Sequence, residues 1–468
     1  MRLSEFIKAY DVRGLVPEQL NETVARAIGQ AFAEVIAIPE DAPGVVIGHD
    51  MRPSSPELSA AFAAGVAERG LDVTMIGLCS TDGLYYASGA LGLPGAMFTA
   101  SHNPAQYNGI KLCRSAARPV GQDSGLVAIT QLAQRLVDDP ATMVPSGPLG
   151  VIRPRDMLGD YAVFLRGLVD LSEMRPLRVV VDAGNGMGGY TVPVVLADSP
   201  VSVIPLYFEL DGTFPNHEAN PLEPENLRDL QAAVRAHGAD AGLAFDGDAD
   251  RCFVIDERGE PVSPSTITAL VAEREIAKEV AAGVDPAQVS IVYNVISSHT
   301  VPQTIAADGA RGIRARVGHS FIKAEMAQHN AVFGGEHSAH YYFREFWFAD
   351  TGMLAALHVL AALGEQPRPL SELVHRYDRL VASGEINSTV SDTAAASARV
   401  EAWAREQGLH LDHLDGLTAE QNTRDPKWWF NVRPSNTEPL LRLNVEAADA
   451  NTMAAVRDAV LQIIRSQS

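Results

Sequence analysis

Short apolar segments of strand-like character alternate with helix-like segments along most of the chain, and this alternation most limits the possible fold. Gly44-Val-Val-Ile-Gly48 precedes a helical pattern over Glu57–Arg69, which precedes Asp72-Val-Thr-Met-Ile76. The same order restarts at Leu177-Arg-Val-Val-Val181 and at Val289-Ser-Ile-Val-Tyr293. Strands that alternate with helices form parallel sheets with helices on both faces. The sequence therefore predicts three α/β domains in succession.

The C-terminal part has a different pattern, which predicts a smaller α+β domain. Strand-like segments at Ile386–Val390, Trp428–Val432 and Leu440–Val445 lead to a helical pattern over Met453–Ile464. Clusters of proline, glycine and charged residues predict the boundaries between domains. The expected domains are 1–153, 154–257, 258–368 and 369–468.

Composition excludes several classes of partner. The 468 residues include 37 Lys and Arg against 58 Asp and Glu, a formal net charge of −21, whereas binding of nucleic acid needs a basic stripe. The apolar stretch Ala355–Leu363 is shorter than the ~20 residues of a membrane helix, and the N-terminal segment lacks the pattern of a secretory signal. The three cysteines are scattered, which fits neither a disulfide framework nor a zinc site. We therefore expect a cytoplasmic protein with no nucleic-acid or membrane partner.

One acidic loop is a candidate metal site. Asp246-Gly-Asp-Ala-Asp-Arg251 lies between the apolar segments Ala241–Phe245 and Cys252–Ile255. Carboxylates this close repel each other unless a cation neutralises them, and oxygen ligands suit a hard divalent ion such as Mg²⁺. An EF-hand is rejected because Arg251 stands where that loop needs glycine and strands replace its helices. A solvated acidic turn is the alternative interpretation.

Thr99-Ala-Ser-His-Asn-Pro104 places a hydroxyl beside an imidazole. Ser101 and His102 suit a nucleophile with a neighbouring base, or a cation for an attached phosphate, and Lys111 adds positive charge. A turn stopped by proline is the simpler interpretation of this loop by itself.

Gly184-Asn-Gly-Met-Gly-Gly189 matches the glycine pattern of a dinucleotide-binding turn, with Glu209 and Asp211 about twenty residues later. The alternative is a turn that needs glycine for purely geometric reasons, because its backbone packs closely or adopts a positive φ.

Two later loops carry polar groups of different chemistry. Gly334-Gly-Glu-His-Ser-Ala-His340 offers a carboxylate, a hydroxyl and imidazoles, which suit sugar hydroxyls; as metal ligands, His337 and His340 would lack a third partner. Arg433-Pro-Ser-Asn-Thr-Glu-Pro439, with Arg442 just beyond, combines the donors that hold a phosphate dianion. A polar surface loop is the alternative for this last segment.

Taken together, these loops resemble those of the α-D-phosphohexomutase superfamily, in its phosphomannomutase/phosphoglucomutase branch. The resemblance runs from Tyr10-Asp-Val-Arg-Gly14 through the loops described above and Gly318-His-Ser-Phe-Ile-Lys323 to the Arg433–Pro439 segment. It implies three similar mixed-sheet α/β domains and a smaller C-terminal α+β domain, similar to the TATA-binding protein, around a central cleft. It also implies a mobile C-terminal domain that closes this cleft.

The resemblance implies an isomerase that works through phosphoserine at Ser101. Its phosphoryl group would pass to a hexose monophosphate, and the hexose 1,6-bisphosphate would turn over and rephosphorylate the serine; added bisphosphate would activate the enzyme. One Mg²⁺ per chain would be held by the Ser101 phosphate, Asp246, Asp248 and Asp250. Arg13, His102, Lys111 and Arg251 would line the transferring end, with Lys111 or His319 as general acid or base. Substrate would be bound by Glu336 and Ser338 at sugar hydroxyls, by Lys323, and at the second phosphate by Arg433, Ser435, Asn436, Thr437 and Arg442.

The expected substrates are hexose phosphates, with mannose phosphates first. The Glu-x-Ser core of the Glu336 loop favours mannose and glucose phosphates over aminosugar phosphates, although His337 and Ala339 replace the usual Met and Gly of this branch. Tyr293–Ser298 lacks the lysine of some dual-specificity members. A phosphomannomutase, monomeric or homodimeric, is therefore expected, with a dual-specificity phosphomannomutase/phosphoglucomutase second. A phosphatase that uses Asp246 or Asp248 as nucleophile, a dinucleotide-dependent dehydrogenase and a non-catalytic sugar-phosphate sensor are three competing hypotheses.

Overall fold

A computed structural model describes residues 2–7, 10–145, 147–377, 379–435 and 440–466 of the chain. The chain forms two compact units. Unit 1 comprises residues 2–262 with Ser338–Leu373, and unit 2 comprises Ser263–His337 with residues 374–466.

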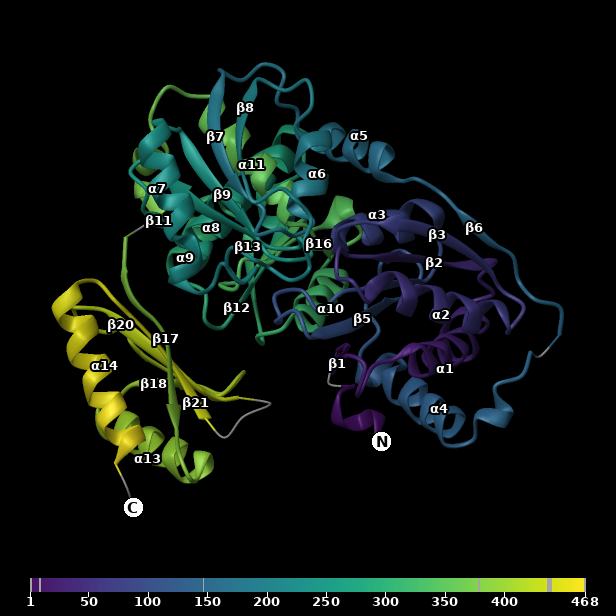
Figure 1. The fold of residues 1–468 in the computed structure, drawn as a ribbon. Coiled ribbons are helices and arrows are strands. Elements are labelled where there is room, and N and C mark those ends of the chain that lie inside the picture. The colour runs from purple at the N-terminus through teal and green to yellow at the C-terminus, as the bar shows by residue number, and fades with distance from the viewer. Residues whose placement is uncertain (1, 8–9, 146, 378, 436–439, 467–468) are drawn as a thin grey trace. The chain divides into compact units, whose positions relative to one another are not determined.

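Unit 1 begins with a mixed six-stranded sheet whose strand order is β1-β5-β4-β2-β3-β6. Its central strands are parallel, whereas β1 and β5 run antiparallel to their neighbours. Figure 1 shows α3 on one face of this sheet and α1, α2 and α4 on the other. The bounds are β1 (Val12–Leu15), α1 (Glu22–Phe32), β2 (Gly44–His49), α2 (Ser55–Ala67), β3 (Asp72–Leu78), α3 (Thr81–Leu91), β4 (Gly95–Phe98), β5 (Tyr107–Cys113), α4 (Leu126–Asp138) and β6 (Ile152–Pro154).

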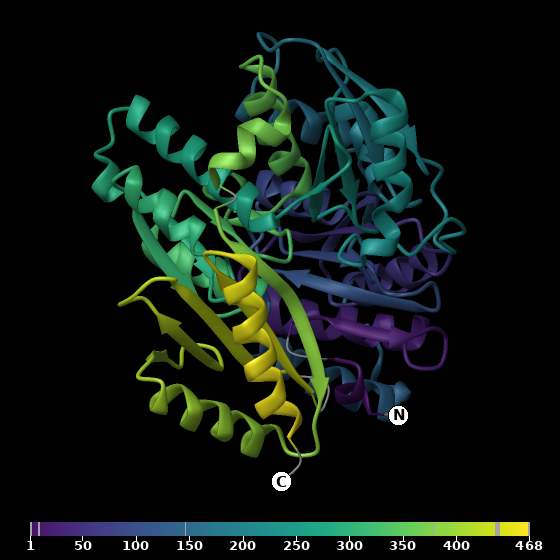
Figure 2. The ribbon, with the colours of Figure 1, turned by 90° about the vertical axis from the view of Figure 1, so that its left-hand side faces the viewer.

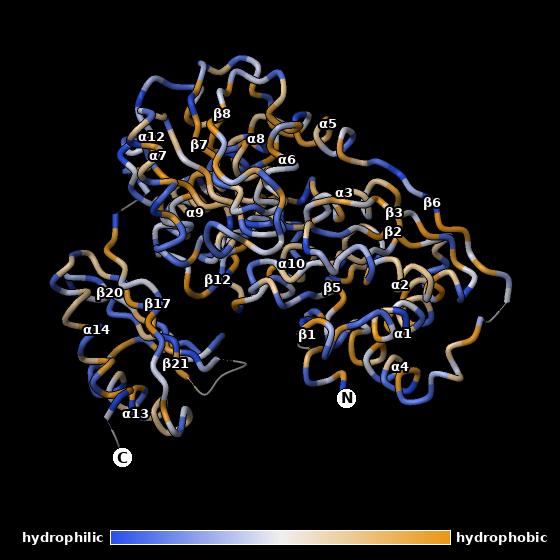
Figure 3. The backbone as a smooth tube through the Cα atoms, in the orientation of Figure 1, coloured by the Kyte–Doolittle hydropathy of each residue, from blue (hydrophilic) through white to orange (hydrophobic). Residues whose placement is uncertain are grey.

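The hydrophobic pattern and the capping of the helices explain how the core beside this first sheet forms. Hydrophobic and hydrophilic residues alternate along α1 and α4 (Figure 3), and α1 packs against α2 and α4, while α2 packs on β2 and β3. Asn21 caps α1 by accepting a hydrogen bond from the Val24 amide, and Ser80 caps α3 in the same way. Phe32, Phe62 and Phe98 meet in the buried core between sheet and helices.

The second sheet of unit 1 has the order β11-β10-β9-β7-β8, with β7 parallel to β8 and β9 and with β9, β10 and β11 antiparallel. α11 is buried along its whole length and packs on β10. The bounds are α5 (Leu158–Leu168), β7 (Leu177–Asp182), α6 (Gly188–Val195), β8 (Val201–Leu206), α7 (Arg228–His237), β9 (Ala241–Phe245), β10 (Cys252–Asp256), β11 (Pro261–Val262) and α11 (Gly352–Gly364), after which comes α12 (Leu370–Val374). Unit 1 also contains β15 (Tyr341–Phe343) and β16 (Ala349–Asp350), which pair antiparallel with each other and are not strands of this sheet.

Unit 2 contains a parallel α/β part and an antiparallel C-terminal sheet. In the first part, β12 lies between β13 and β14 and is parallel to both. Its elements are α8 (Pro264–Ala281), β12 (Ser290–Asn294), α9 (Thr300–Ala307), β13 (Arg311–Ala315), α10 (His319–His329) and β14 (Phe333–Gly335).

The C-terminal sheet has the order β17-β21-β20-β19-β18 and is antiparallel throughout. α13 and α14 pack on each other and share one apolar core with the sheet (Figure 2). Its elements are β17 (Val381–Thr389), α13 (Thr393–Glu406), β18 (His410–Asp412), β19 (Leu417–Gln421), β20 (Trp428–Pro434), β21 (Leu440–Ala447) and α14 (Ala450–Arg465).

The fold class expected from the sequence is confirmed, with one difference from the parallel sheets that the alternation alone predicts. The two sheets of unit 1 are mixed because the connections after β4 and β9 are short hairpin loops, and parallel neighbours need a crossover of a dozen or more residues. Sequence reasoning missed α13, β18 and β19 in the C-terminal domain. No helix within the described residues is long and apolar enough to cross a membrane.

Candidate active site

The Ser101 loop connects β4 and β5 and is held in a strained local conformation. Ser101 has φ 51°, its amide donates to Thr99 Oγ1 at 2.9 Å, and its side chain is buried. Its Oγ donates to Asp246 Oδ2 at 2.8 Å. A left-handed conformation at a serine costs free energy that the surrounding contacts must offset.

Arg52, which sequence reasoning missed, supplies many of those contacts. Its fully buried guanidinium donates to the carbonyl oxygens of four residues of the loop and the strand that follows it, and it pairs with Asp50 at 3.2 Å. The accepting carbonyls, at 2.7–3.0 Å, belong to Ser101, Asn103, Pro104 and Tyr107. A charged Asp-x-Arg triplet directly after the buried strand β2 was the signal that could have identified it.

The acidic loop connects β9 and β10 and lies directly against the Ser101 loop. A Cβ added to Gly247 would lie 2.4 Å from the Ser101 carbonyl oxygen, so only glycine allows this approach. Asp246, Asp248 and Asp250 are all buried, and one oxygen of each lies within 4.8 Å of the others. The structure therefore brings the predicted nucleophile and the predicted metal ligands together.

The hydrogen bonds of this loop leave particular oxygens open for a cation. Asp248 Oδ2 accepts from Lys111 Nζ at 2.6 Å and from Thr81 Oγ1 at 2.6 Å, and Asp250 Oδ2 accepts from Lys111 Nζ at 2.6 Å. The Oδ1 atoms of Asp248 and Asp250 are buried and have no hydrogen-bond partner among the described residues. Buried carboxylate oxygens need a partner, so this donor set fits a hard divalent cation.

The pKa values of the acidic loop follow from burial and from these pairings. Burial and the neighbouring carboxylates raise the pKa of Asp246 to about 7, against the opposing effect of Arg251. For Asp248, burial acts to raise the pKa, but the Lys111 ammonium and the Thr81 hydroxyl hold it well below its usual range. Without a cation, therefore, the loop does not carry full negative charge on all its carboxylates near neutral pH.

Basic groups surround the two loops. Arg251 donates from Nε to Asp246 Oδ2 at 3.0 Å, and its Nη2 lies 2.8 Å from His102 Nδ1. Burial and the charge of Arg251 lower the pKa of His102 well below its usual value. Arg13 on β1 contacts Asp11 and Asn103. The predicted catalytic residues of unit 1 thus form one cluster.

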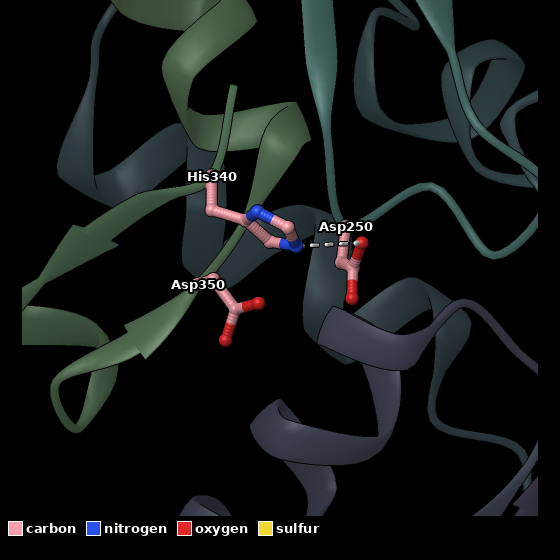
Figure 4. Close-up of side chains that lie close together, drawn as sticks. All are labelled: Asp250, His340 and Asp350. Carbon is pink, nitrogen blue, oxygen red and sulfur yellow. Dashed lines mark ion pairs between the residues drawn. The ribbon is translucent and has the colours of Figure 1, made fainter. Parts of the chain in front are cut away.

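His340 also joins this cluster, a contact that sequence reasoning left unassigned. Its Nε2 lies 3.8 Å from Asp250 Oδ1, and Asp350 lies close by on β16 (Figure 4). Ser338 Oγ lies 3.0 Å from His340 Nδ1. Ser338 was expected to bind sugar hydroxyls, and in the structure its hydroxyl contacts an imidazole beside the acidic loop.

The glycine-rich turn after β7 supports the acidic loop. The Met187 amide donates to the Gly247 carbonyl at 2.9 Å, and a Cβ on Gly186 would lie 2.7 Å from the same oxygen. A Cβ on Gly189 would lie 2.3 Å from the Phe208 carbonyl oxygen. These close approaches favour the geometric interpretation of the turn.

In unit 2, Glu336 follows β14 and is buried. Its Oε2 accepts from Asn294 Nδ2 and from the Gly318 amide, both at 3.2 Å. His319 is the first residue of α10 and is half-buried, and Lys323, one turn later, is buried. Glu336, His319 and Lys323 are therefore placed by neighbouring segments of one α/β domain.

Of the predicted phosphate-binding residues, the two arginines lie on strands of the C-terminal sheet of unit 2. Arg433 on β20 is directly opposite Arg442 on β21, and the Ser435 amide donates to the Leu440 carbonyl at 2.9 Å. Glu385 on β17, missed by sequence reasoning, contacts both arginines at 2.7 and 3.2 Å. Asn436 and Thr437 lie outside the described residues.

Comparisons with known proteins match the whole chain. The four models of the phosphoglucomutase/phosphomannomutase family match in order: α/β/α domains I, II and III at residues 5–136, 160–259 and 263–380, and the C-terminal domain at residues 385–463. The chain is 41% identical to phosphohexose mutases of Xanthomonas campestris over 443 residues, 94% of each chain. It is 39% identical to a phosphomannomutase of Escherichia coli over 468 residues, 98% of each chain.

Solved structures show the same likeness. The structure of a phosphoglucomutase/phosphomannomutase family protein from Burkholderia thailandensis superposes with a TM-score of 0.87 at 28% identity, covering 100% of this chain and 99% of the other. Parafusin, a phosphoglucomutase from Paramecium, shares the fold with a TM-score of 0.76 at 14% identity, covering 98% and 95%.

Proposed function

The chain belongs to the phosphoglucomutase/phosphomannomutase family, and on that premise we propose that it is a phosphomannomutase that interconverts mannose 1-phosphate and mannose 6-phosphate. The reaction proceeds through phosphoserine at Ser101 and a hexose 1,6-bisphosphate. The observation that carries this proposal is the position of the Ser101 hydroxyl, 2.8 Å from Asp246 in a buried cluster with Lys111 and Arg251. Such a cluster provides the charge stabilisation on which phosphoryl transfer depends.

In the transfer step, the bond between phosphorus and Ser101 Oγ breaks and a bond to a sugar hydroxyl oxygen forms. Asp246, Asp248, Asp250 and the Ser101 phosphate would hold one Mg²⁺ per chain, which would supply Lewis-acid stabilisation of negative charge. Arg13, His102 and Arg251 add donors on the protein side. The return step reverses these bonds at the other phosphate of the sugar.

The proton of the attacking sugar hydroxyl needs an acceptor, and Lys111 is poorly suited to that role. Burial acts to lower its pKa, but its pairing with Asp248 and Asp250 holds the pKa well above its usual value. We therefore assign Lys111 the role of a fixed charge. His319, or His340 beside Asp250, is the better candidate for the general base because an imidazole ring can both accept and donate a proton.

The residues of unit 2 serve substrate binding in this proposal. Glu336, with Ser338 of unit 1, binds sugar hydroxyls, and Lys323 adds a buried positive charge. Arg433, Ser435, Asn436, Thr437 and Arg442 hold the phosphate that is not being transferred. An arginine pair is well suited to a phosphate because each guanidinium presents donors in a planar fork.

Phosphoglucomutase activity in the same site is the second candidate, because the family description names both reactions. The absence of lysine from Tyr293–Ser298 is the observation that places mannose phosphates first. Hexose 1,6-bisphosphate is the proposed activator.

The proposal also covers the domain limits, the cellular location and the oligomeric state of the protein. The domain limits 1–153, 154–257, 258–368 and 369–468 stay predictions. All three cysteines are free and buried, which supports a reducing cytoplasm, and the proposed assembly is a monomer or homodimer with no nucleic-acid or membrane partner.

A side-by-side assay tests the proposed function. Conversion of mannose 1-phosphate and of glucose 1-phosphate to the 6-phosphates is measured with Mg²⁺ and hexose bisphosphate, with Ser101→Ala as control. We expect about tenfold preference for mannose and loss of turnover in the variant. Near-equal rates would establish a dual-specificity enzyme. Release of inorganic phosphate would establish a phosphatase, and binding without turnover would establish a sensor.

A further inference from the structure

The C-terminal sheet places two arginines side by side on the face opposite α13 and α14. Phe430 and Val432 of β20 and Leu441 and Leu443 of β21 belong to the core under α13 and α14. Because side chains alternate along a strand, Arg433 and Arg442 point to the opposite face. They are direct cross-strand partners, and like charges in that arrangement repel.

Glu385 neutralises this pair from the adjacent strand. It pairs with Asn444 on β21, two positions along the strand from Arg442, so it lies on the same face as the arginines. From there its Oε2 accepts from Arg433 Nη2 at 2.7 Å and its Oε1 accepts from Arg442 Nη1 at 3.2 Å. One carboxylate therefore bridges both guanidinium groups.

Both arginines keep a donor that the bridge does not use. Their Nε atoms are buried and have no hydrogen-bond partner within the described part of the chain, and the same holds for Asn444 Nδ2. A phosphate dianion can accept from several such donors at once. It would then lie beside the Glu385 carboxylate, where two anions compete for the same positive charge.

We propose that Glu385 is a positioning residue. In the free chain its carboxylate is the anion that pairs with Arg433 and Arg442. In the complex it competes with the phosphate for these arginines and so weakens phosphate binding. This inference rests on the proposed function. A mutase must release one phosphate of the bisphosphate from its anchor and bind the other there. A competing carboxylate keeps the arginines placed and paired while it lowers the barrier to that exchange.

The test is substitution of Glu385 by glutamine, which keeps the shape and removes the charge. Calorimetric titration of the intact protein with inorganic phosphate should show a dissociation constant about tenfold lower than that of the unmodified chain. In steady-state turnover, KM and kcat should fall together, because tighter binding slows release. An unchanged or higher dissociation constant, or a higher KM, would overturn the proposal in favour of a merely structural bridge.

Two control variants make the result specific. Glu420→Gln removes the same charge from β19 of the same sheet, where Glu420 faces His299 rather than either arginine, and it should leave phosphate binding unchanged. In an Arg442→Met background, Glu385→Gln should gain less affinity, because one of the two contested guanidinium groups is gone. An equally large gain in phosphate affinity in the Arg442→Met background would contradict the proposal.

The proposed function and this inference fail in different ways. If the unmodified chain neither binds inorganic phosphate nor converts hexose phosphates, the proposed function fails. If the unmodified chain turns over and Glu385→Gln binds phosphate no more tightly, only the inference about Glu385 fails.

Discussion

At the scale of single residues, the site depends on side chains that hold its loops in place. Arg52 donates its hydrogen bonds to backbone carbonyls of the Ser101 loop. Lysine at this position would keep the charge but could not reproduce the planar set of donors. The conformation of Ser101 at φ 51° therefore depends on a residue far from it in sequence.

We expect Arg52→Lys to lower stability and activity together. Loss of two or more buried hydrogen bonds should lower the free energy of unfolding by about 2 kcal/mol. Displacement of the Ser101 loop should lower kcat/KM about 100-fold. Urea denaturation and steady-state assays measure these effects, with Arg153→Lys as control because its pair with Asp72 is exposed. Unchanged turnover in Arg52→Lys would show that the Ser101 loop keeps its conformation without the Arg52 guanidinium.

At the scale of elements, the N-terminus of α3 supports the acidic loop. The Thr81 amide donates to the Asp248 carbonyl at 3.0 Å, and its hydroxyl donates to Asp248 Oδ2 at 2.6 Å. Thr81 is fully buried. With Oδ2 engaged by Thr81 and Lys111, Asp248 keeps its Oδ1 for the proposed cation, so one helix end would orient a proposed metal ligand from another domain.

We expect Thr81→Val to weaken metal binding more than it weakens the fold. The variant keeps the shape but removes the hydroxyl, and residues that orient metal ligands typically contribute about 10-fold or more to metal affinity. Titration with Mg²⁺, followed by calorimetry, measures the change. Thr81→Ser keeps the hydroxyl and should bind Mg²⁺ nearly as tightly as the unmodified chain does. An equal loss of Mg²⁺ affinity in both variants would show that the effect comes from packing.

At the scale of the whole of unit 1, one buried carboxyl joins three distant segments. Asp82 on α3 accepts from Tyr161 on α5 at 2.7 Å, from Thr351 at the start of α11 at 2.7 Å, and from Ser80. Burial raises the pKa of Asp82 to about 6, against the effect of these hydrogen bonds. The fold therefore favours the neutral acid at this position.

The sign of the resulting pH dependence follows from that raised pKa. A group whose pKa is higher in the folded than in the unfolded state contributes stability that is full below about pH 4 and is lost as the pH rises through about 6. Asparagine cannot ionise, so Asp82→Asn should gain stability relative to the unmodified chain over this range, by on the order of 3 kcal/mol. Urea unfolding at several pH values measures this difference, and a difference independent of pH would contradict the assignment.

The sequence could predict much of the fold because its signals are local. Apolar segments such as Ala241–Phe245 became strands with the predicted limits, and the loops at Ser101 and Asp246–Asp250 lie together in the structure. The weakly apolar strands β18 and β19 and the helix α13 were missed. Their identity depends on packing against β20 and α14 rather than on their own periodicity.

The sequence by itself predicted the chemistry that we propose for the chain, because the proposed nucleophile, the acidic loop and the arginines each occur in short motifs. Only the tertiary structure decided which residues serve them, because Arg52, Thr81 and Glu385 act across 49, 167 and 48 residues of sequence. The physical reason is that a motif records local spacing. A hydrogen bond to a buried carboxylate or carbonyl exists only after the strands that bring its partners together have paired.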